Sequence, residues 1–371
     1  MYLKFEKIYN FKNVCAAELE FSPKLNCITG NNGEGKTNLL DSIYYLCMTK
    51  SYFSVSDTYV FKSGEQEFSL NGEFIKEDCT IDNISITART PSEKHLKKNG
   101  KVLQRFSEHI GGYPVVMISP DDSNIINGSA DMRRKFLNSI LCQLDKLYLA
   151  AVQRYNTALA NRNKLLKTGN VQAEVLEMLN MKLSNEAWYI FAKRNELIYN
   201  INPLVQRYYA VLCSNGDKAL AEYSSQLYTR RNEGKDALKN LLENSYAKDC
   251  ILKFTSCGVH RDDIDFTISG LPIRQCASQG EQKSFCVALK LAQYTIMKQA
   301  YGFAPILLLD DIFDKLDMNR VENLLKMVAS EDFGQIFISD CNFERTQQLV
   351  SSLRRESRNF KVVNGLFEQI I

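Results

Sequence analysis

The fold of this chain is decided by one stretch, Gly30-Asn31-Asn32-Gly33-Glu34-Gly35-Lys36-Thr37. It fits the pattern G-x-x-x-x-G-K-[ST] at every position. The apolar segment 25–29 precedes it with the character of a strand, and residues 38–46 continue it with helical spacing. Between a strand and a helix, such a loop turns its backbone N–H groups toward phosphate oxygens, and the helix N-terminus adds positive potential. The sequence therefore predicts a phosphate-binding loop.

Each part of this loop has a predicted task. Lys36 reaches the β- and γ-phosphates, and the Thr37 hydroxyl is a ligand for Mg²⁺. The predicted cofactors are ATP and Mg²⁺, and the residues expected to hold ATP are Gly30, Asn31, Asn32, Gly33, Glu34, Gly35, Lys36 and Thr37. The alternative is a glycine turn that matches the pattern by chance. The strand and helix on either side favour the nucleotide site.

A pair of carboxylates follows an apolar run near the C-terminal end. The run 305–309 predicts a buried parallel strand, and Asp310 and Asp311 come directly after its aliphatic residues. A Walker B strand has this form, so Asp310 is expected to hold the Mg²⁺ shell and Asp311 to orient the attacking water. The alternative is an ordinary Asp-rich turn. Together with the glycine loop, the pair makes Lys36, Asp310 and Asp311 the candidate catalytic residues.

A third motif lies about thirty residues before the carboxylates. Ser278-Gln279-Gly280-Glu281-Gln282 opens a predicted helix over 284–300 and is similar to the signature of ABC-type ATPases. A serine and a glycine at a helix N-terminus make a second phosphate site, for which Ser278, Gly280 and Gln282 are candidates. Both are also ordinary capping residues, which is the alternative. Segment 314–317 is placed like a D-loop, and Asp340 stands where this class keeps a switch histidine.

The spacing of apolar residues and turn residues divides the chain into two parts. Residues 1–120 and 251–371 alternate short strands, turns and helices, as in an α/β head domain with mixed sheets and flanking helices. Residues 121–250 read as a mainly helical insertion, because apolar residues such as Phe136, Ile140 and Leu144 recur at three- and four-residue spacing.

Composition narrows the class of protein. With 371 residues, 45% hydrophobic and 24% charged, the chain is an ordinary globular protein. Eleven cysteines without a Cys-x-x-Cys pair and three histidines argue against disulfide and zinc frameworks and favour the reducing cytoplasm. The longest aliphatic run, 306–309, is far below the ~20 residues that span a bilayer. We expect no membrane association.

The sequence resembles the RecF family of bacterial recombination mediators over essentially its whole length. The arginine-rich element before Phe136 and the Gly-x-His-Arg-Asp-Asp element are more specific than the ATPase motifs. The matching stretches are 10–13, 30–37, 50–51, 119–122, Gly128 with 133–137, 161–163, 258–263, the Ser278 motif and 309–311. Two positions depart from the pattern. Phe53 stands where arginine is usual, and Val259 replaces the usual proline.

The resemblance implies more than the motifs do. It implies an SMC-like, ABC-type ATPase head with a helical lobe (lobe II) and no long coiled coil. It also implies a homodimer that forms on ATP, hydrolyses ATP weakly with stimulation by DNA, and clamps double-stranded DNA near single-strand/double-strand junctions. By the same resemblance, RecO and RecR are partners in loading RecA. The implied biological roles are recombinational repair, replication-fork maintenance and induction of the SOS response.

Two basic clusters are the candidate DNA contacts, because lysine and arginine clusters supply salt-dependent phosphate contacts. Residues 94–105 carry five basic side chains and no acid, and residues 131–170 carry eight against two. The candidates are Lys97, Lys98, Lys101, Arg133, Arg134 and Lys135. The alternative for each cluster is a solvated surface. Because no base-reading motif is present, binding independent of sequence is expected.

Two other functions share some of these motifs. The ATPase subunit of a membrane ABC transporter shares all three nucleotide motifs. It predicts a switch histidine and ~100 residues between loop and signature, whereas here the gap runs from Lys36 to Ser278. A small-molecule P-loop kinase has no use for the Ser278 motif. Both are disfavoured.

Overall fold

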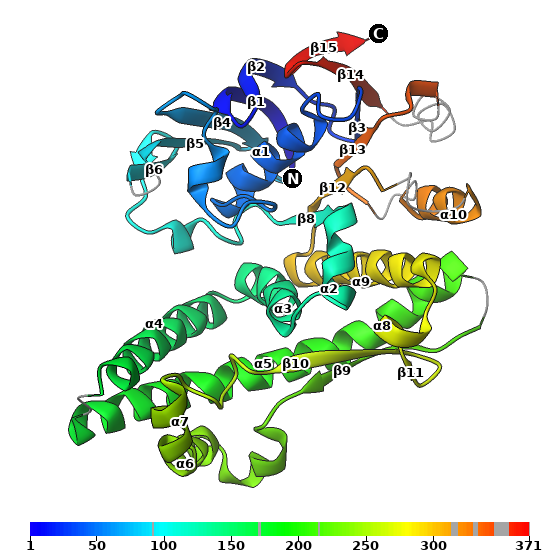
Figure 1. The fold of residues 1–371 in the computed structure, drawn as a ribbon. Helices are drawn as coiled ribbons and strands as arrows, with labels where there is room; N and C mark the ends of the chain where they lie inside the picture. Colours follow the sequence, from blue (N-terminus) through cyan, green and yellow to red (C-terminus); the bar gives the residue numbers. More distant parts are fainter. Residues whose placement is uncertain are drawn as a thin grey trace. The chain divides into compact units, whose positions relative to one another are not determined.

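The computed structural model describes residues 1–90, 93–169, 172–213, 216–312, 318–328, 333–344 and 356–370. They form two compact units (Figure 1). The head unit comprises Met1–Asp122, Tyr208–Ser214 and Gln279–Ile371, and the helical unit comprises Ser123–Arg207 and Asn215–Ser278.

The head unit contains an antiparallel sheet in the order β2-β1-β4-β5-β6-β7. Its strands alternate buried and exposed residues, so one face is packed and the other is open, as the pleat requires. The strands are β1 (Tyr2–Phe11), β2 (Val14–Glu20), β4 (Phe68–Ile75), β5 (Ile81–Thr90), β6 (Glu93–Lys98) and β7 (Lys101–Val102).

A second, mixed sheet in the head unit has the order β15-β14-β3-β13-β12-β8. The strands β3, β13, β12 and β8 run parallel and are buried along their whole length, which explains why they read as largely apolar runs in the sequence. The strands are β3 (Leu25–Thr29), β8 (Val115–Ile118), β12 (Ile306–Asp310), β13 (Ile336–Asp340), β14 (Ser357–Val363) and β15 (Leu366–Ile370).

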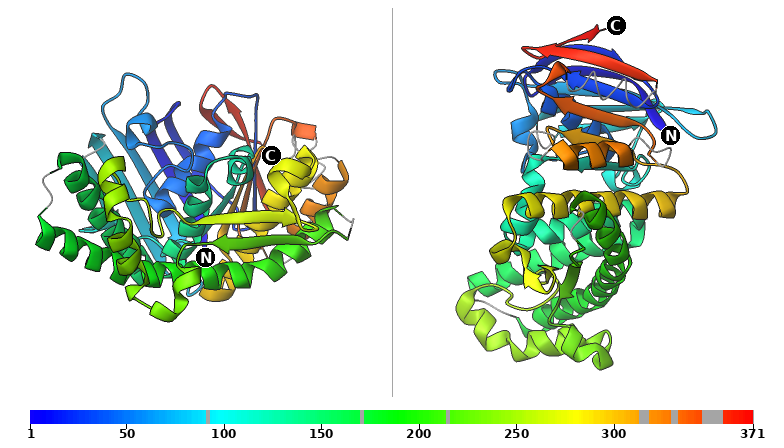
Figure 2. Two further views of the ribbon diagram at one scale, coloured as in Figure 1. Left: turned by 60° about the horizontal axis from the view of Figure 1, so that its bottom comes forward. Right: turned by 90° about the vertical axis from the view of Figure 1, so that its right-hand side faces the viewer.

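Helices join the two sheets of the head unit. Helix α1 (Lys36–Met48) is almost entirely buried and contacts strands of both sheets, including β4 and β13 (Figures 1 and 2). Gln335, just before β13, links the two sheets. Its side-chain amide accepts from the N–H of Leu3 in β1 at 2.8 Å and donates to the Leu3 carbonyl oxygen at 2.7 Å. The unit also contains α9 (Gln279–Tyr301) and α10 (Met318–Val328).

The packed face of β1 carries an acid, Glu6, which is fully buried. Burial raises the pKa of Glu6 to about 8, against a smaller lowering by Ser42. The unfolded chain releases this proton near pH 4.5. Between the two values the folded chain holds a proton that the unfolded chain has lost, so stability falls as pH rises.

We therefore expect the free energy of unfolding to fall by about 2 kcal/mol between about pH 6 and pH 8 because of Glu6 alone. The variant Glu6→Gln should lose this component, and Glu18→Gln, an exposed acid on β2, should keep it. Urea melts at both pH values measure the difference. Equal pH dependence in Glu6→Gln and wild type would refute the assignment.

The helical unit is built on helix α5, a helix of 41 residues that contains Pro203. Strand β9 lies along it, because the Asn202 side chain donates to and accepts from the backbone of Ala221 at 2.9 and 2.8 Å (Figure 2). The helices are α2 (Ser123–Asn127), α3 (Ala130–Leu144), α4 (Lys146–Thr168), α5 (Ala173–Cys213), α6 (Asp236–Asn244), α7 (Tyr246–Leu252) and α8 (Ile273–Cys276). The strands are β9 (Ala219–Ser224), β10 (Asp263–Ile268) and β11 (Leu271–Pro272), in the order β11-β10-β9.

The packing differs from the expected division at two segments. Tyr208–Ser214, expected in the insertion, belong to the head unit. We expected 251–278 in the head domain, but these residues pack with the helical unit. The physical reason is strand pairing, since β10 is antiparallel to β9 from Asp263↔Ser224 to Ile268↔Ala219. Among the described residues, no helix is both long enough and apolar enough to cross a bilayer.

Candidate nucleotide-binding site

The glycine loop leaves β3 and enters α1, as the sequence predicts, and each of its three glycines has a physical reason. A Cβ on Gly30 would lie 2.5 Å from the carbonyl oxygen of Val362. Gly33 and Gly35 have φ angles of 84° and 117°, which favour glycine. A Cβ on Gly35 would also lie 2.9 Å from the Asn13 side chain. These constraints from φ and from neighbouring atoms set the curl of the loop.

Lys36 is folded over this loop. Its ammonium group donates to the carbonyl oxygens of Gly30 and Asn31 at 2.7 and 2.9 Å, and only 5% of the residue is exposed. Gly35 caps α1 without a side-chain hydrogen bond, and the first turn carries no acid. The Asn38 N–H already donates to the Gly35 carbonyl oxygen at 3.1 Å, so Lys36 and Thr37 carry the N–H groups that this helix end offers to an anion.

Parallel strands bring the predicted Walker B acid to the loop. Asp310, at the end of β12, accepts hydrogen bonds from Thr37 Oγ1 at 3.0 Å to each carboxylate oxygen and from Ser339 Oγ at 2.7 Å. Only 4% of Asp310 is exposed. Thus two residues that are 273 positions apart, Thr37 and Asp310, meet as expected for a shared metal site.

The environment of Asp310 fits a divalent cation. Burial raises the pKa of this carboxyl group, and hydrogen bonds from Ser339 and Thr37 offset part of the rise. A nearby cation favours the ionised form of a buried acid. The donors are a carboxylate and a hydroxyl, which are the hard oxygen ligands that Mg²⁺ prefers.

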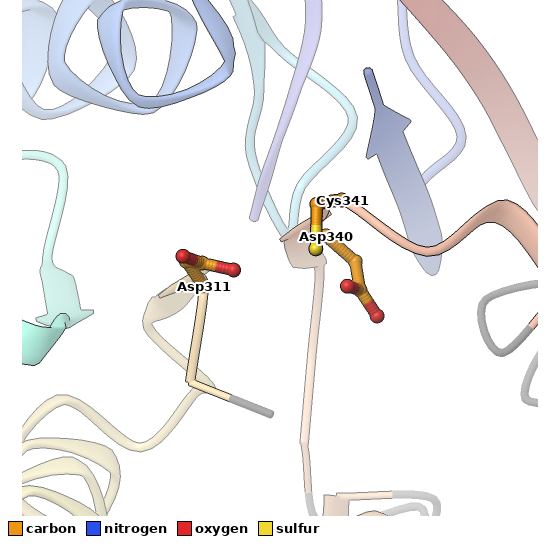
Figure 3. A group of neighbouring side chains, drawn as sticks. All are labelled: Asp311, Asp340 and Cys341. Atoms are coloured by element: carbon orange, nitrogen blue, oxygen red, sulfur yellow. The ribbon is translucent and has the colours of Figure 1, made fainter. Parts of the chain in front are cut away.

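Asp311 lies next to the Walker B acid with a φ of 45°, a sparsely populated backbone conformation for a residue other than glycine. Its N–H donates to the Ser339 hydroxyl at 3.0 Å, which fixes this turn. One ligand atom each of Asp311, Asp340 and Cys341 lie within 4.8 Å of one another at the adjacent ends of β12 and β13 (Figure 3). Asp340, at the expected switch position, is fully buried.

Two residues at this site carry roles that the sequence reasoning did not assign. The Asn13 side chain packs on Gly35 and accepts from Asn38 Nδ2 at 2.6 Å, so it supports the loop from the β1–β2 turn. Ser339 bonds both Asp310 and Asp311. A polar residue at the end of the strand beside a Walker B strand was the signal available for Ser339.

The signature segment begins helix α9. Ser278 is exposed, and Gly280 and Gln282 are half-buried in the first turn. Ser284 Oγ donates to the Gly280 carbonyl oxygen at 2.9 Å, within the helix. The predicted D-loop, 314–317, lies outside the described residues.

The first basic cluster follows strands β6 and β7 at the edge of the antiparallel sheet. Lys97 and Lys101 are exposed, and neither forms an ion pair with the part of the chain that the structure describes. Lys98 lies 3.0 Å from Asp82 and its ammonium group lies over the Tyr113 ring. Two of the three candidates therefore present free charge.

The second basic cluster does not have the expected exposure. Arg133 forms a two-pronged ion pair with Asp263 at 2.5 and 3.0 Å and donates to the Gly128 carbonyl oxygen at 3.0 Å. Arg134 donates to the Asp262 carbonyl oxygen at 2.7 Å, and burial lowers its pKa. These placements do not fit DNA contact by Arg133 and Arg134, whose charges are used inside the helical unit. Lys135 is exposed and pairs with Asp131 at 2.8 Å.

The other family-specific residues also meet inside the helical unit. His260 bonds the Tyr155 hydroxyl at 2.8 Å, and Arg194 lies 3.4 Å from Asp262. A second buried pair joins Arg162 and Asp249 at 2.7 Å. Buried pairs of this kind specify how helices and loops meet, because removing one partner leaves a buried charge uncompensated.

The two departures from the family pattern have simple surroundings. The Phe53 ring lies 5.4 Å beneath the Lys12 ammonium group, a cation–π contact in place of a second cation. Val259 contributes its carbonyl oxygen to Arg194 Nη1 at 2.7 Å, which any residue at this position would do.

Comparison with known proteins agrees with this geometry. The family described as RecF/RecN/SMC N terminal domain matches residues 2–361. The DNA replication and repair protein RecF of Parabacteroides distasonis is 40% identical over 365 residues, covering 98% of each chain. That of Flavobacterium johnsoniae is 40% identical over 366 residues, covering 98% of this chain and 100% of the relative.

Solved structures show the same fold. A structure of the recombination mediator protein RecF with ATP, from the RecFOR pathway, has a TM-score of 0.90 at 29% identity, covering 100% of this chain and 98% of that one. The Smc head domain of Pyrococcus furiosus has a TM-score of 0.57 at 16% identity, which supports the fold alone. The predicted SMC-like, ABC-type head with a helical insertion is confirmed, and the described residues contain no long coiled coil.

These matches exclude the alternative that the chain is the ATPase subunit of a membrane transporter, because they extend over nearly the whole chain and not over the nucleotide motifs alone. The chain belongs to the RecF family of DNA replication and repair proteins, within the RecF/RecN/SMC N-terminal domain family.

Proposed function

We propose that this protein is an ATP-dependent DNA clamp of recombinational repair and replication-fork maintenance. ATP drives two copies together, the dimer holds DNA near single-strand/double-strand junctions, and the clamp helps RecO and RecR to load RecA and so supports SOS induction. The observation that carries the proposal is the meeting of the glycine loop with Asp310 through Thr37 Oγ1 at 3.0 Å.

In this proposal, residues 30–37 hold the triphosphate of ATP. The Lys36 ammonium group exchanges its two loop carbonyls for phosphate oxygens, and the free N–H groups of α1 add to the cradle. Thr37 and Asp310 are the residues that would hold Mg²⁺, which neutralises phosphate charge when bound.

Hydrolysis in this proposal is slow and serves as a switch. Asp311 accepts a hydrogen bond from the attacking water, and its backbone is held by Ser339 at 3.0 Å. The carboxylate orients the water and receives its proton, whereas Asp310 stays committed to Thr37 and the metal.

Dimerisation uses the signature segment. Ser278 and the N–H groups around Gly280 begin a helix of 23 residues, whose N-terminus attracts the γ-phosphate held by the second copy. Ser278, Gly280 and Gln282 are thus proposed to bind nucleotide in trans. ATP then favours the dimer, and ADP, without a γ-phosphate, does not.

The variant Ser278→Arg tests this arrangement. We expect it to bind nucleotide almost normally, because its own glycine loop is intact, but to stay monomeric with ATP in sedimentation velocity runs. Gln275→Arg is the matched control, since Gln275 is exposed three residues earlier and gains the same charge. A Ser278→Arg protein that dimerises with ATP as wild type does would overturn the trans arrangement.

In this proposal the DNA contacts of the head unit are Lys97 and Lys101, with Lys98 beside Asp82. In the helical unit, Lys135 beside Asp131 is a separate candidate. Arg133 and Arg134 instead hold α3 to residues 262–263. Contact to phosphates by side chains alone gives binding without sequence preference.

We expect the double variant Lys97→Glu/Lys101→Glu to bind junction DNA more weakly. The slope of log affinity against log salt should fall by about 2, because each lost phosphate contact removes about 0.9. Lys7→Glu/Lys24→Glu, with two other exposed lysines, is the control for net charge. Fluorescence anisotropy at several salt concentrations measures the slope, and equal slopes for the two double variants would exclude this edge of the sheet.

A further inference from the structure

Gly280 lies in the middle of the signature segment, and its backbone conformation does not require a glycine. It is the second residue of α9 and is absent from the glycines with positive φ, so an alanine would fit the backbone. Glycine in a helix also loses more conformational entropy on folding than alanine does. The absence of a side chain at Gly280 instead leaves room for a group from a neighbouring helix.

The structure shows what lies there. A Cβ built on Gly280 would lie 2.3 Å from Nη1 of Arg320 and 3.4 Å from its Cζ. Real Cβ atoms essentially never approach another heavy atom below 3.0 Å. The guanidinium group of Arg320 thus rests directly on the backbone of Gly280, at the start of α9.

The backbone of Arg320 is held in place by the rest of its helix. Val321, Leu324 and Val328 of α10 are buried, and Asn323 Nδ2 donates to the Val211 carbonyl oxygen at 3.0 Å. Arg320 itself is only half-buried. A fixed helix therefore presents a cation to the signature segment, while the long side chain keeps freedom to adjust its tip.

The charge of Arg320 is unusual for this location. The N-terminus of a helix carries partial positive charge and is normally stabilised by acids, whereas cations are favoured at the C-terminus. Glu281 is the acid of the first turn of α9. A guanidinium group added at the same end of the helix increases the positive potential there, and a bound anion would gain from both.

We propose that Arg320 is a phosphate-binding residue of the signature site. It adds a charged, two-pronged donor to the helix N–H groups and Ser278, and it contacts the γ-phosphate held by the glycine loop of a second copy. Planar guanidinium groups match phosphate oxygens well, and hydrogen bonds between charged groups are the strong ones. This inference rests on the proposed ATP-dependent dimer.

The test compares dimerisation of Arg320 variants with ATP by sedimentation velocity. Arg320→Ala should bind ATP as a monomer with wild-type affinity, but its dimer dissociation constant should rise about tenfold to a hundredfold. Arg320→Lys should recover part of the loss, because it keeps the charge without the fork. Lys326→Ala, an exposed lysine paired with Glu322 on the same helix, should dimerise as wild type does.

If Arg320 served only for packing, the variants would differ in another way in their dimer dissociation constants. Arg320→Gln keeps most of the side-chain volume without the charge, so it separates packing from phosphate binding. If Arg320→Gln or Arg320→Ala dimerised as wild type does, the inference would be wrong. Failure of the wild-type protein to dimerise with ATP would instead contradict the proposed function.

Discussion

Replacing Lys36 with alanine is expected to abolish ATP-dependent function while leaving the fold intact. The ammonium group is the one side-chain cation of the glycine loop, and it donates to the carbonyl oxygens of Gly30 and Asn31. Loss of its charge-assisted bonds to phosphate should weaken ATP binding at least about a hundredfold. Lys36→Arg should be less severe, because it keeps the charge in a group too large for the cradle.

Two measurements separate this effect from misfolding. Thermal unfolding of Lys36→Ala should be close to that of wild type, since the helix and strand around the loop keep their packing. Lys24→Ala is the matched control, because Lys24 is exposed just before β3, the strand that leads into the loop. Isothermal titration that shows wild-type nucleotide affinity in Lys36→Ala would refute the assignment of the loop.

The second large effect concerns the acids at the end of β12. Asp311→Asn should bind ATP and dimerise, but hydrolysis should fall by about 10²- to 10⁴-fold, the usual contribution of a positioned general base. The amide keeps the shape of the side chain and loses the charge that orients water. The expected product is a dimer that persists after ATP is added.

Asp310→Asn should fail in a different way. Its carboxylate accepts from Thr37 and Ser339, so the amide should disturb the metal site and raise the Mg²⁺ concentration needed for activity. Asp265→Asn, an exposed acid in the helical unit, should change neither property. Normal phosphate release by both Asp310→Asn and Asp311→Asn would show that this strand is not a Walker B strand.

The geometry of the glycine loop could be predicted because its constraints are local. A glycine loop needs its glycines at set positions within eight residues, and Gly30, Gly33 and Gly35 each meet a constraint from φ or from a neighbouring atom. The meeting of Thr37 with Asp310 then follows from parallel strands that end at the same edge of a sheet.

The DNA-contacting residues could not be predicted from the basic clusters in the same way, because a count of charges in the sequence does not show which of them are buried. Arg133 looks like part of a DNA surface until its partner Asp263, 130 residues away, is placed beside it. The pairing of β9 with β10 that moves 251–278 to the helical unit is non-local in the same sense. Arg320 was missed for this reason too, since its contact with Gly280 joins two helices.

In the proposed dimer each nucleotide is shared by two copies of the chain, and a mixture of two inactive variants shows whether it is. Lys36→Ala lacks the loop cation and Ser278→Arg lacks a working signature, so neither should hydrolyse ATP alone. In a mixed dimer, the intact loop of one copy faces the intact signature of the other. We predict that hydrolysis and ATP-stimulated DNA binding reappear on mixing and rise with the share of mixed dimers. A mixture that stays as inactive as its components, while wild type is active under the same conditions, would contradict the account.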